Sequence, residues 1–102
     1  MNVQEKYQRL EDTVRSYNPG ANFDLIRSAF HYAEEHHRGQ NRKDGSPFVT
    51  HPLAVAQIVA EELHLDSESI AAALLHDTLE DTDATHEDIA RTFSPTIADI
   101  VE

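Results

Sequence analysis

The stretch IAAALLHDTLED, residues 70–81, decides the fold. Its first six residues are all apolar, so a helix that begins here is apolar on every side. Its last six residues include four ionisable ones, namely His76, Asp77, Glu80 and Asp81. At about 100° of rotation per residue, an α-helix places all four on one side of its axis. The stretch therefore predicts a core helix that carries a charged patch at its end.

Outward from this stretch, apolar residues recur at spacings of three and four, which predicts helices almost throughout the chain. We expect helices at about residues 3–17, 23–37, 50–63, 67–79, 85–93 and from 94 onward. Their expected starts include an N-cap at Thr50 with Pro52 in the first turn, a cap at Asp66 or Ser67, and a capping box formed by Thr85 and Asp88. No alternating run predicts a strand. Residues 1–102 are therefore expected to form one all-α domain, a helical bundle.

Composition excludes several classes of protein. The chain has no cysteine, so a disulfide framework and a thiolate metal site are excluded, and any metal is held by nitrogen and oxygen. The formal net charge is −11, which disfavours nucleic-acid binding. No apolar run approaches the ~20 residues that span a bilayer, and no signal segment begins the chain. We expect a cytoplasmic protein without a nucleic-acid or membrane partner.

The charged end of the 70–81 helix has two interpretations. Three carboxylates this close repel one another unless a cation lies among them, and carboxylates with an imidazole suit Mn²⁺, Fe²⁺ or Zn²⁺. His51, at the start of another helix, is the candidate second imidazole. Alternatively, the helix end is simply solvated and His51 is a core or capping residue. The residues alone leave both interpretations open.

Two longer motifs add a resemblance to a known family. They are HRGQNRKDGSPFVTHP, residues 37–52, and AAALLHDTLEDT, residues 71–82. Together, in this order and at this separation, they resemble the N-terminal hydrolase domain of RelA/SpoT-type (Rel) proteins, members of the HD superfamily of metal-dependent phosphohydrolases. The resemblance extends over essentially the whole chain and implies an HD-domain helical bundle.

This resemblance implies Mn²⁺-dependent hydrolysis of the alarmone (p)ppGpp to GDP or GTP plus pyrophosphate, as part of stringent-response control by a bifunctional Rel protein. The implied metal ligands are His51, His76 and Asp77. Glu80 and Asp81 are implied to handle the water and its protons. Arg42 and Lys43 are implied to lie against the guanine nucleotide. The chain departs from the family at Phe48, where tyrosine is usual, and at Asp44 and Ser46, which we interpret as loop changes that leave the function intact.

The family's fourth metal ligand is an aspartate in a later helix, so the resemblance implies a domain truncated at its C-terminus that continues beyond residue 102. We expect such a fragment to be weakly active or inactive. We also expect it to self-associate through apolar surface left uncovered on its third, fourth and sixth helices. Two alternative functions remain open: an HD phosphohydrolase for another nucleotide, and a non-catalytic nucleotide-binding module that regulates another protein.

Overall fold

A computed structural model describes residues 1–101, which contain seven α-helices and, apart from one isolated bridge, no β-structure. The helices are α1 (Val3–Tyr17), α2 (Phe23–His36), α3 (Thr50–Leu63), α4 (Ser67–Leu75), α5 (Thr78–Asp81), α6 (His86–Thr92) and α7 (Pro95–Val101). The all-α prediction is confirmed, and each expected helix is present except that the fourth is divided in two. Residue 102, where the last helix was expected to continue, lies outside the described residues.

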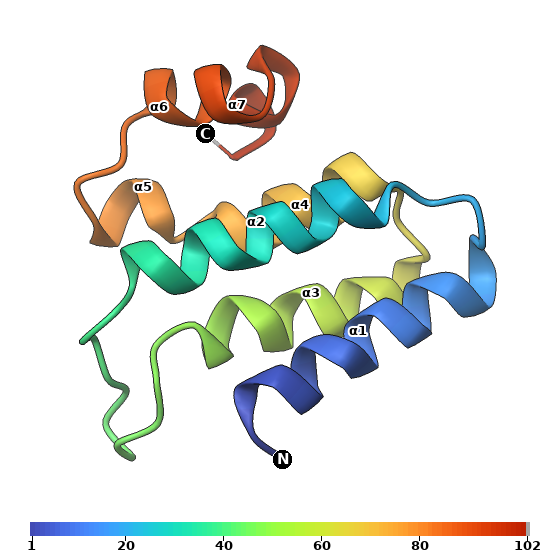
Figure 1. Ribbon diagram of the computed structural model, residues 1–102, viewed down its shortest axis with the longest axis horizontal. Coiled ribbons are helices and arrows are strands. Elements are labelled where there is room, and N and C mark those ends of the chain that lie inside the picture. Colours follow the sequence, from blue (N-terminus) through green and yellow to red (C-terminus); the bar gives the residue numbers. More distant parts are fainter. Residues whose placement is uncertain (102) are drawn as a thin grey trace.

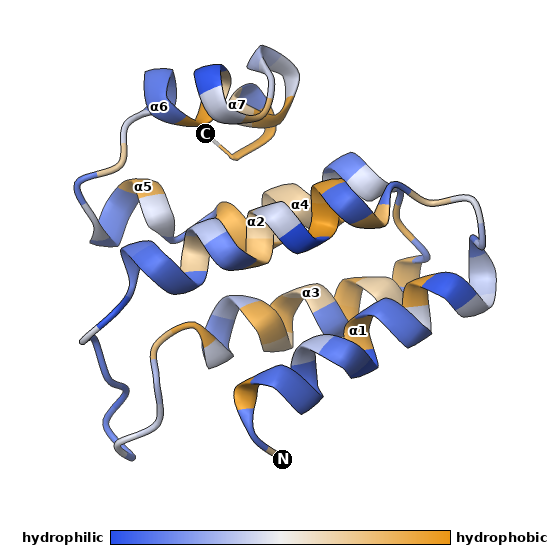
Figure 2. Ribbon diagram, in the orientation of Figure 1, coloured by the Kyte–Doolittle hydropathy of each residue, from blue (hydrophilic) through white to orange (hydrophobic). Residues whose placement is uncertain are grey.

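The helices lie in layers around α4. Helix α1 packs beside α3, α2 lies against α4, and α4 also contacts α3 and α7. In Figure 1 the α2–α4 layer lies between the α1–α3 pair and the α6–α7 pair. The buried residues of α4 are Ile70, Ala71, Ala72, Leu74 and Leu75. Figure 2 shows α3 and α4 as strongly apolar and α1 as mostly hydrophilic, which is typical of a surface helix with one buried stripe.

Side-chain caps fix the starts of α4 and α6. Asp66 accepts a hydrogen bond from the Ser69 N–H at 2.9 Å, so Asp66 is the N-cap of α4. Thr85 and Asp88 bond reciprocally at the start of α6, which confirms the predicted capping box. Each cap satisfies backbone N–H groups that have no partner within the helix.

The expected cap at Thr50 is wrong. Helix α3 is preceded by Val49 and has no side-chain cap. The Thr50 hydroxyl instead donates to the carbonyl of Pro47 at 2.8 Å, which ties the loop before α3 to the first turn of the helix. This contact places His51 in the first turn of α3, next to Pro52.

The helix expected over residues 67–79 is interrupted after Leu75. In an uninterrupted helix, the Ala73 carbonyl accepts the N–H of Asp77. Here the His76 ring lies with Nδ1 2.8 Å from that carbonyl and occupies the same acceptor. A side chain that competes for a backbone acceptor in this way weakens the regular ladder. The regular α-helix therefore ends at Leu75 and α5 begins at Thr78, with His76 and Asp77 between them in right-handed helical backbone conformations.

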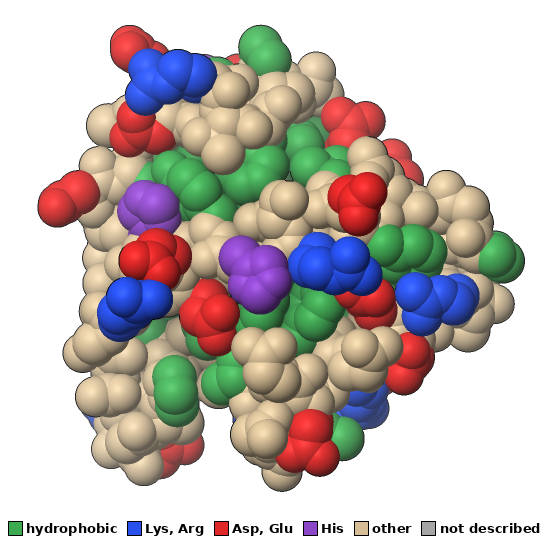
Figure 3. Space-filling view, in the orientation of Figure 1, with side chains coloured by type: hydrophobic (Ala, Val, Ile, Leu, Met, Phe, Trp, Pro, Cys, Tyr) green, Lys and Arg blue, Asp and Glu red, His purple; other side chains and the backbone are tan. Residues whose placement is uncertain are grey.

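Apolar exposure is confined to a few positions. The large apolar side chains that are exposed include Ile58 and Leu63 on α3 and Ile100 on α7, at 59%, 63% and 49%. The expectation of uncovered apolar surface therefore holds for these two helices, whereas it is wrong for α4, which is covered by α2, α3 and α7. In Figure 3 acidic and basic side chains are interspersed on the face shown. No helix among the described residues is long and apolar enough to cross a membrane.

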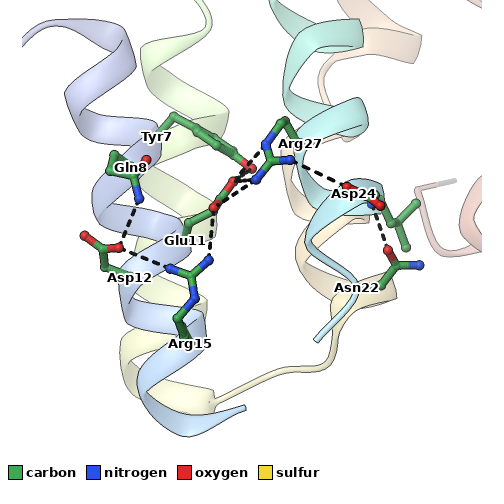
Figure 4. A network of polar contacts seen from close by, with 9 residues as sticks. Tyr7, Gln8, Glu11, Asp12, Arg15, Asn22, Asp24 and Arg27 are labelled. Carbon is green, nitrogen blue, oxygen red and sulfur yellow. Dashed lines mark hydrogen bonds and ion pairs between the residues drawn. The ribbon is translucent and has the colours of Figure 1, made fainter. Parts of the chain in front are cut away.

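A buried carboxylate joins α1 to α2. The side chain of Glu11 is 4% exposed and accepts hydrogen bonds from the Tyr7 hydroxyl at 2.6 Å and from Arg27 at 2.9 Å (Figure 4). Arg15 contributes a longer contact at 3.4 Å. Burial alone raises the pKa of Glu11, but the bonds from Tyr7 and Arg27 outweigh it and hold that pKa below its ordinary value. Glu11 is therefore ionised and paired at neutral pH.

Replacing Glu11→Gln is expected to lower the free energy of unfolding by about 1–3 kcal/mol at pH 7, because charge-assisted bonds are lost at a buried site. Since the pKa of Glu11 is lower in the folded chain than in the unfolded one, its stabilisation is complete above about pH 4.3 and is lost as the pH falls through the folded pKa. The Glu11→Gln variant should therefore lose less free energy of unfolding than the wild type when the pH is lowered, because it has no carboxylate to protonate at this position. Urea denaturation at pH 7 and at acid pH measures both effects.

The matched control is Glu61→Gln, which removes an exposed ion pair with Arg9 and should cost less than about 1 kcal/mol. Equal losses for the two variants would contradict a special role for Glu11.

Candidate metal centre

Three predicted ligands meet where the first turn of α3 faces the end of α4. One ligand atom from each of His51, His76 and Asp77 lies within 4.8 Å of the others. The Nε2 atom of His51 is 3.3 Å from Asp77 Oδ2, and the Nε2 atom of His76 is 3.2 Å from Asp77 Oδ1. The Asp77 side chain is 13% exposed, and the two imidazoles are 38% and 39% exposed. The site is therefore a shallow one, with the carboxylate at its floor.

The ring of His76 is oriented by the backbone. Its Nδ1 lies 2.8 Å from the Ala73 carbonyl, an atom that only accepts, so Nδ1 carries a proton and donates. In the neutral imidazole the other nitrogen, Nε2, then presents a lone pair toward Asp77. This is the arrangement of a metal-binding histidine, whose second nitrogen is held by a backbone or carboxylate acceptor.

Asp77 lacks the donors that a buried carboxylate needs. Its Oδ2 atom is buried and accepts no hydrogen bond from any described residue. The nearby Nε2 atom of His51 does not meet hydrogen-bond geometry, and the neutral tautomer of His76 offers Oδ1 only a lone pair. Unpaired carboxylate oxygens beside nitrogen lone pairs are unfavourable unless a cation lies among them. Two imidazole nitrogens and one carboxylate therefore fit a divalent ion of the Mn²⁺, Fe²⁺ and Zn²⁺ type.

A cavity of about 560 Å³ opens beside these groups. It is lined by Asn41, Arg42, Lys43, Asp44, Phe48, His51 and Asp77. The basic residues belong to the loop between α2 and α3, which turns sharply at Gly45, where φ is +87°. Hydrogen bonds from the Ser46 hydroxyl and backbone hold the pKa of Asp44 below its ordinary value. The cavity thus combines two cationic side chains with one carboxylate next to the candidate metal ligands.

Glu80 and Asp81 lie outside the three-residue group. Both are exposed on α5, which starts one residue after Asp77. Neither residue belongs to the His51, His76 and Asp77 group, and their part in the chemistry stays a prediction.

Sequence reasoning missed Gln40. Its amide Nε2 donates to the carbonyl of Asp81 at 2.8 Å, and its Oε1 lies 3.1 Å from Nδ1 of His37. His37 is 2% exposed, and its ring lies tilted against that of Phe48, with 4.7 Å between the ring centroids. Gln40 lies within the 37–52 motif, but an uncharged amide in a polar loop gives no signal of a long-range contact.

Comparison with known protein families matches residues 29–102 to the HD domain. The chain belongs to the HD-domain family. It is 46% identical over 93 residues to the GTP pyrophosphokinase rsh of Brucella melitensis. It is 42% identical over 96 residues to the bifunctional (p)ppGpp synthase/hydrolase SpoT of Escherichia coli. It is also 44% identical over 95 residues to a GTP pyrophosphokinase of Myxococcus xanthus.

These matches place the HD domain among RelA/SpoT-type sequences and confirm the resemblance drawn from the two motifs. They cover 91 to 94% of this chain. The chain, however, spans only 12 to 14% of the length of these relatives.

The first test of the site concerns metal binding. We expect Asp77→Asn to weaken Mn²⁺ binding by more than about 100-fold, because the change removes the anionic donor yet keeps the side chain's size. Isothermal titration calorimetry measures this affinity. His31→Ala is the control, since His31 is 58% exposed on α2 and should leave binding unchanged. Equal Mn²⁺ affinity in wild type and Asp77→Asn would contradict the assignment.

Proposed function

We propose that this HD domain hydrolyses the alarmone (p)ppGpp, releasing the 3′-pyrophosphate and leaving GDP or GTP. One observation carries the proposal: two imidazoles and a carboxylate with an unpaired buried oxygen adjoin a cavity that Arg42 and Lys43 line. A divalent-ion site beside paired cations suits a substrate with several phosphates. The relatives named for (p)ppGpp hydrolysis supply the identity of the nucleotide.

The chemical difficulty is charge. A pyrophosphate ester carries several negative charges that repel an incoming nucleophile, and this chain adds a formal net charge of −11. A divalent ion held by His51, His76 and Asp77 would supply phosphoryl charge neutralisation and a more acidic water. Three protein donors leave further coordination positions for water, substrate or a ligand outside this chain.

The remaining roles fall to the loop and to α5. Arg42 pairs with phosphate or stacks on the guanine base, and Lys43 adds a second positive charge in the cavity. Glu80 and Asp81 orient the attacking water and accept its proton, and the proton then passes to solvent or to the leaving pyrophosphate. Both carboxylates are exposed on α5, just beyond the ligand pair.

We propose Mn²⁺ as the ion, because a mixed imidazole and carboxylate set is intermediate between the preferences of Zn²⁺ and Mg²⁺. We propose the cytoplasm as the compartment, where the guanine nucleotide products are used. The alternative is an HD phosphohydrolase for another nucleotide. The observation that supports this alternative is the metal-ligand group, because the same group would serve the hydrolysis of any nucleotide.

The decisive experiment uses the purified protein at the full length that its gene encodes and supplies ppGpp and Mn²⁺, or other nucleotides and Mn²⁺ in parallel. Anion-exchange chromatography resolves the products. We expect GDP and pyrophosphate in equal amounts, and loss of turnover by more than about 100-fold in Asp77→Asn. Asp24→Asn, an exposed change on α2, is the matched control. Turnover of other nucleotides without ppGpp would establish the alternative. Nucleotide binding without any turnover would favour a non-catalytic module, and either result would overturn the proposal.

A separate prediction concerns the proton-handling residue. Glu80→Gln keeps the size of the side chain and removes its basicity, so kcat for ppGpp should fall about 10²–10⁴-fold. Mn²⁺ affinity and the thermal midpoint should stay at their wild-type values, because Glu80 is exposed and outside the ligand group. Unchanged turnover would remove Glu80 from the mechanism.

A further inference from the structure

We infer that Gln40 is a positioning residue that couples the Arg42–Lys43 loop to α5, so that the substrate loop and the Glu80–Asp81 segment move as one unit. This inference rests on the proposed function for its consequence in turnover. The coupling itself rests on hydrogen bonds and burial alone. Gln40 itself contacts none of the three candidate metal ligands, and we assign it no contact with the nucleotide.

The coupling begins with a chain of hydrogen bonds of fixed direction. The Asp81 carbonyl only accepts, so the group that Gln40 presents to it at 2.8 Å is the NH₂. The amide oxygen of Gln40 therefore faces Nδ1 of His37, 3.1 Å away, and His37 donates from that nitrogen. Because His37 is 2% exposed and packs against the ring of Phe48, the core holds this hydrogen-bond donor in place.

Gln40 also closes the neck of the loop. Its backbone carbonyl accepts from the Phe48 N–H at 2.9 Å, just outside the bridge between Asn41 and Pro47. Within this neck the Arg42 N–H donates to the Ser46 carbonyl at 2.8 Å. The backbone of Gln40 thus fixes the base of the loop next to Phe48, and its side chain attaches the loop to Asp81 of α5.

The other end of the contact is a weak element. Helix α5 has only four residues, and the carbonyl of its last residue, Asp81, lacks the helical partner that a longer helix would provide. So short a helix has little stability of its own, and its position depends on contacts outside it. The Gln40 amide supplies one such contact from a residue 41 positions earlier in the chain.

The test replaces Gln40→Glu, which keeps the side chain's shape but exchanges the donor for a carboxylate that faces the Asp81 carbonyl. We expect amide hydrogen exchange to accelerate about tenfold in both segments, residues 41–46 and 79–83, since one lost bond releases both. The KM for ppGpp should rise about tenfold. Mn²⁺ affinity should remain within about twofold of wild type, because Gln40 contacts none of the three ligands.

Gln4→Glu is the matched control, with the same change of charge at an exposed position of α1, and it should alter none of these quantities. A second variant, His37→Asn, retains a donor toward Gln40 and should accelerate exchange less than His37→Leu, which has none. Unchanged exchange in Gln40→Glu, or acceleration in only one segment, would overturn the inference. Absence of ppGpp turnover in the wild type would instead count against the proposed function and leave the exchange result intact.

Discussion

The structure depends on one electrostatic constraint: Asp77 is held against His51 and His76 while its buried Oδ2 atom accepts no hydrogen bond. The packing of α3 on α4 imposes this arrangement, since the three residues come from the facing ends of these helices. Such a cluster is unfavourable by itself and becomes favourable when a divalent ion supplies the missing positive charge. Before an ion binds, the burial of α4 holds these side chains near one another.

The candidate metal ligands and the other proposed site residues lie on different kinds of element. The imidazoles and Asp77 are carried on or beside buried helices, whereas the basic residues and the exposed carboxylates lie on a loop and on a one-turn helix. Functional side chains on packed helices are positioned more precisely than those carried on loops. The Gln40 contact restricts this loop and the short helix, because it holds them to each other.

Much of this architecture could be predicted from the sequence. Periodicity gave the helix positions, the caps at Asp66 and Thr85 followed from short-range chemistry, and His51, His76 and Asp77 followed from spacing and from the Rel resemblance. The turn after Leu75 could not be predicted, because it depends on a ring nitrogen competing for one backbone carbonyl. Long-range polar contacts were missed for a related reason. A glutamine or a buried glutamate looks the same in sequence whether or not a distant partner exists.

We propose that His51, His76 and Asp77 together bind one divalent cation, and the chemistry proposed above depends on that ion. The most direct measurement is anomalous scattering from crystals of the protein grown with manganese, collected on both sides of the manganese absorption edge. We expect one strong peak at about 2.0–2.3 Å from a nitrogen of each imidazole and from an oxygen of Asp77. Crystals that diffract well and show no manganese peak among these three side chains would contradict it.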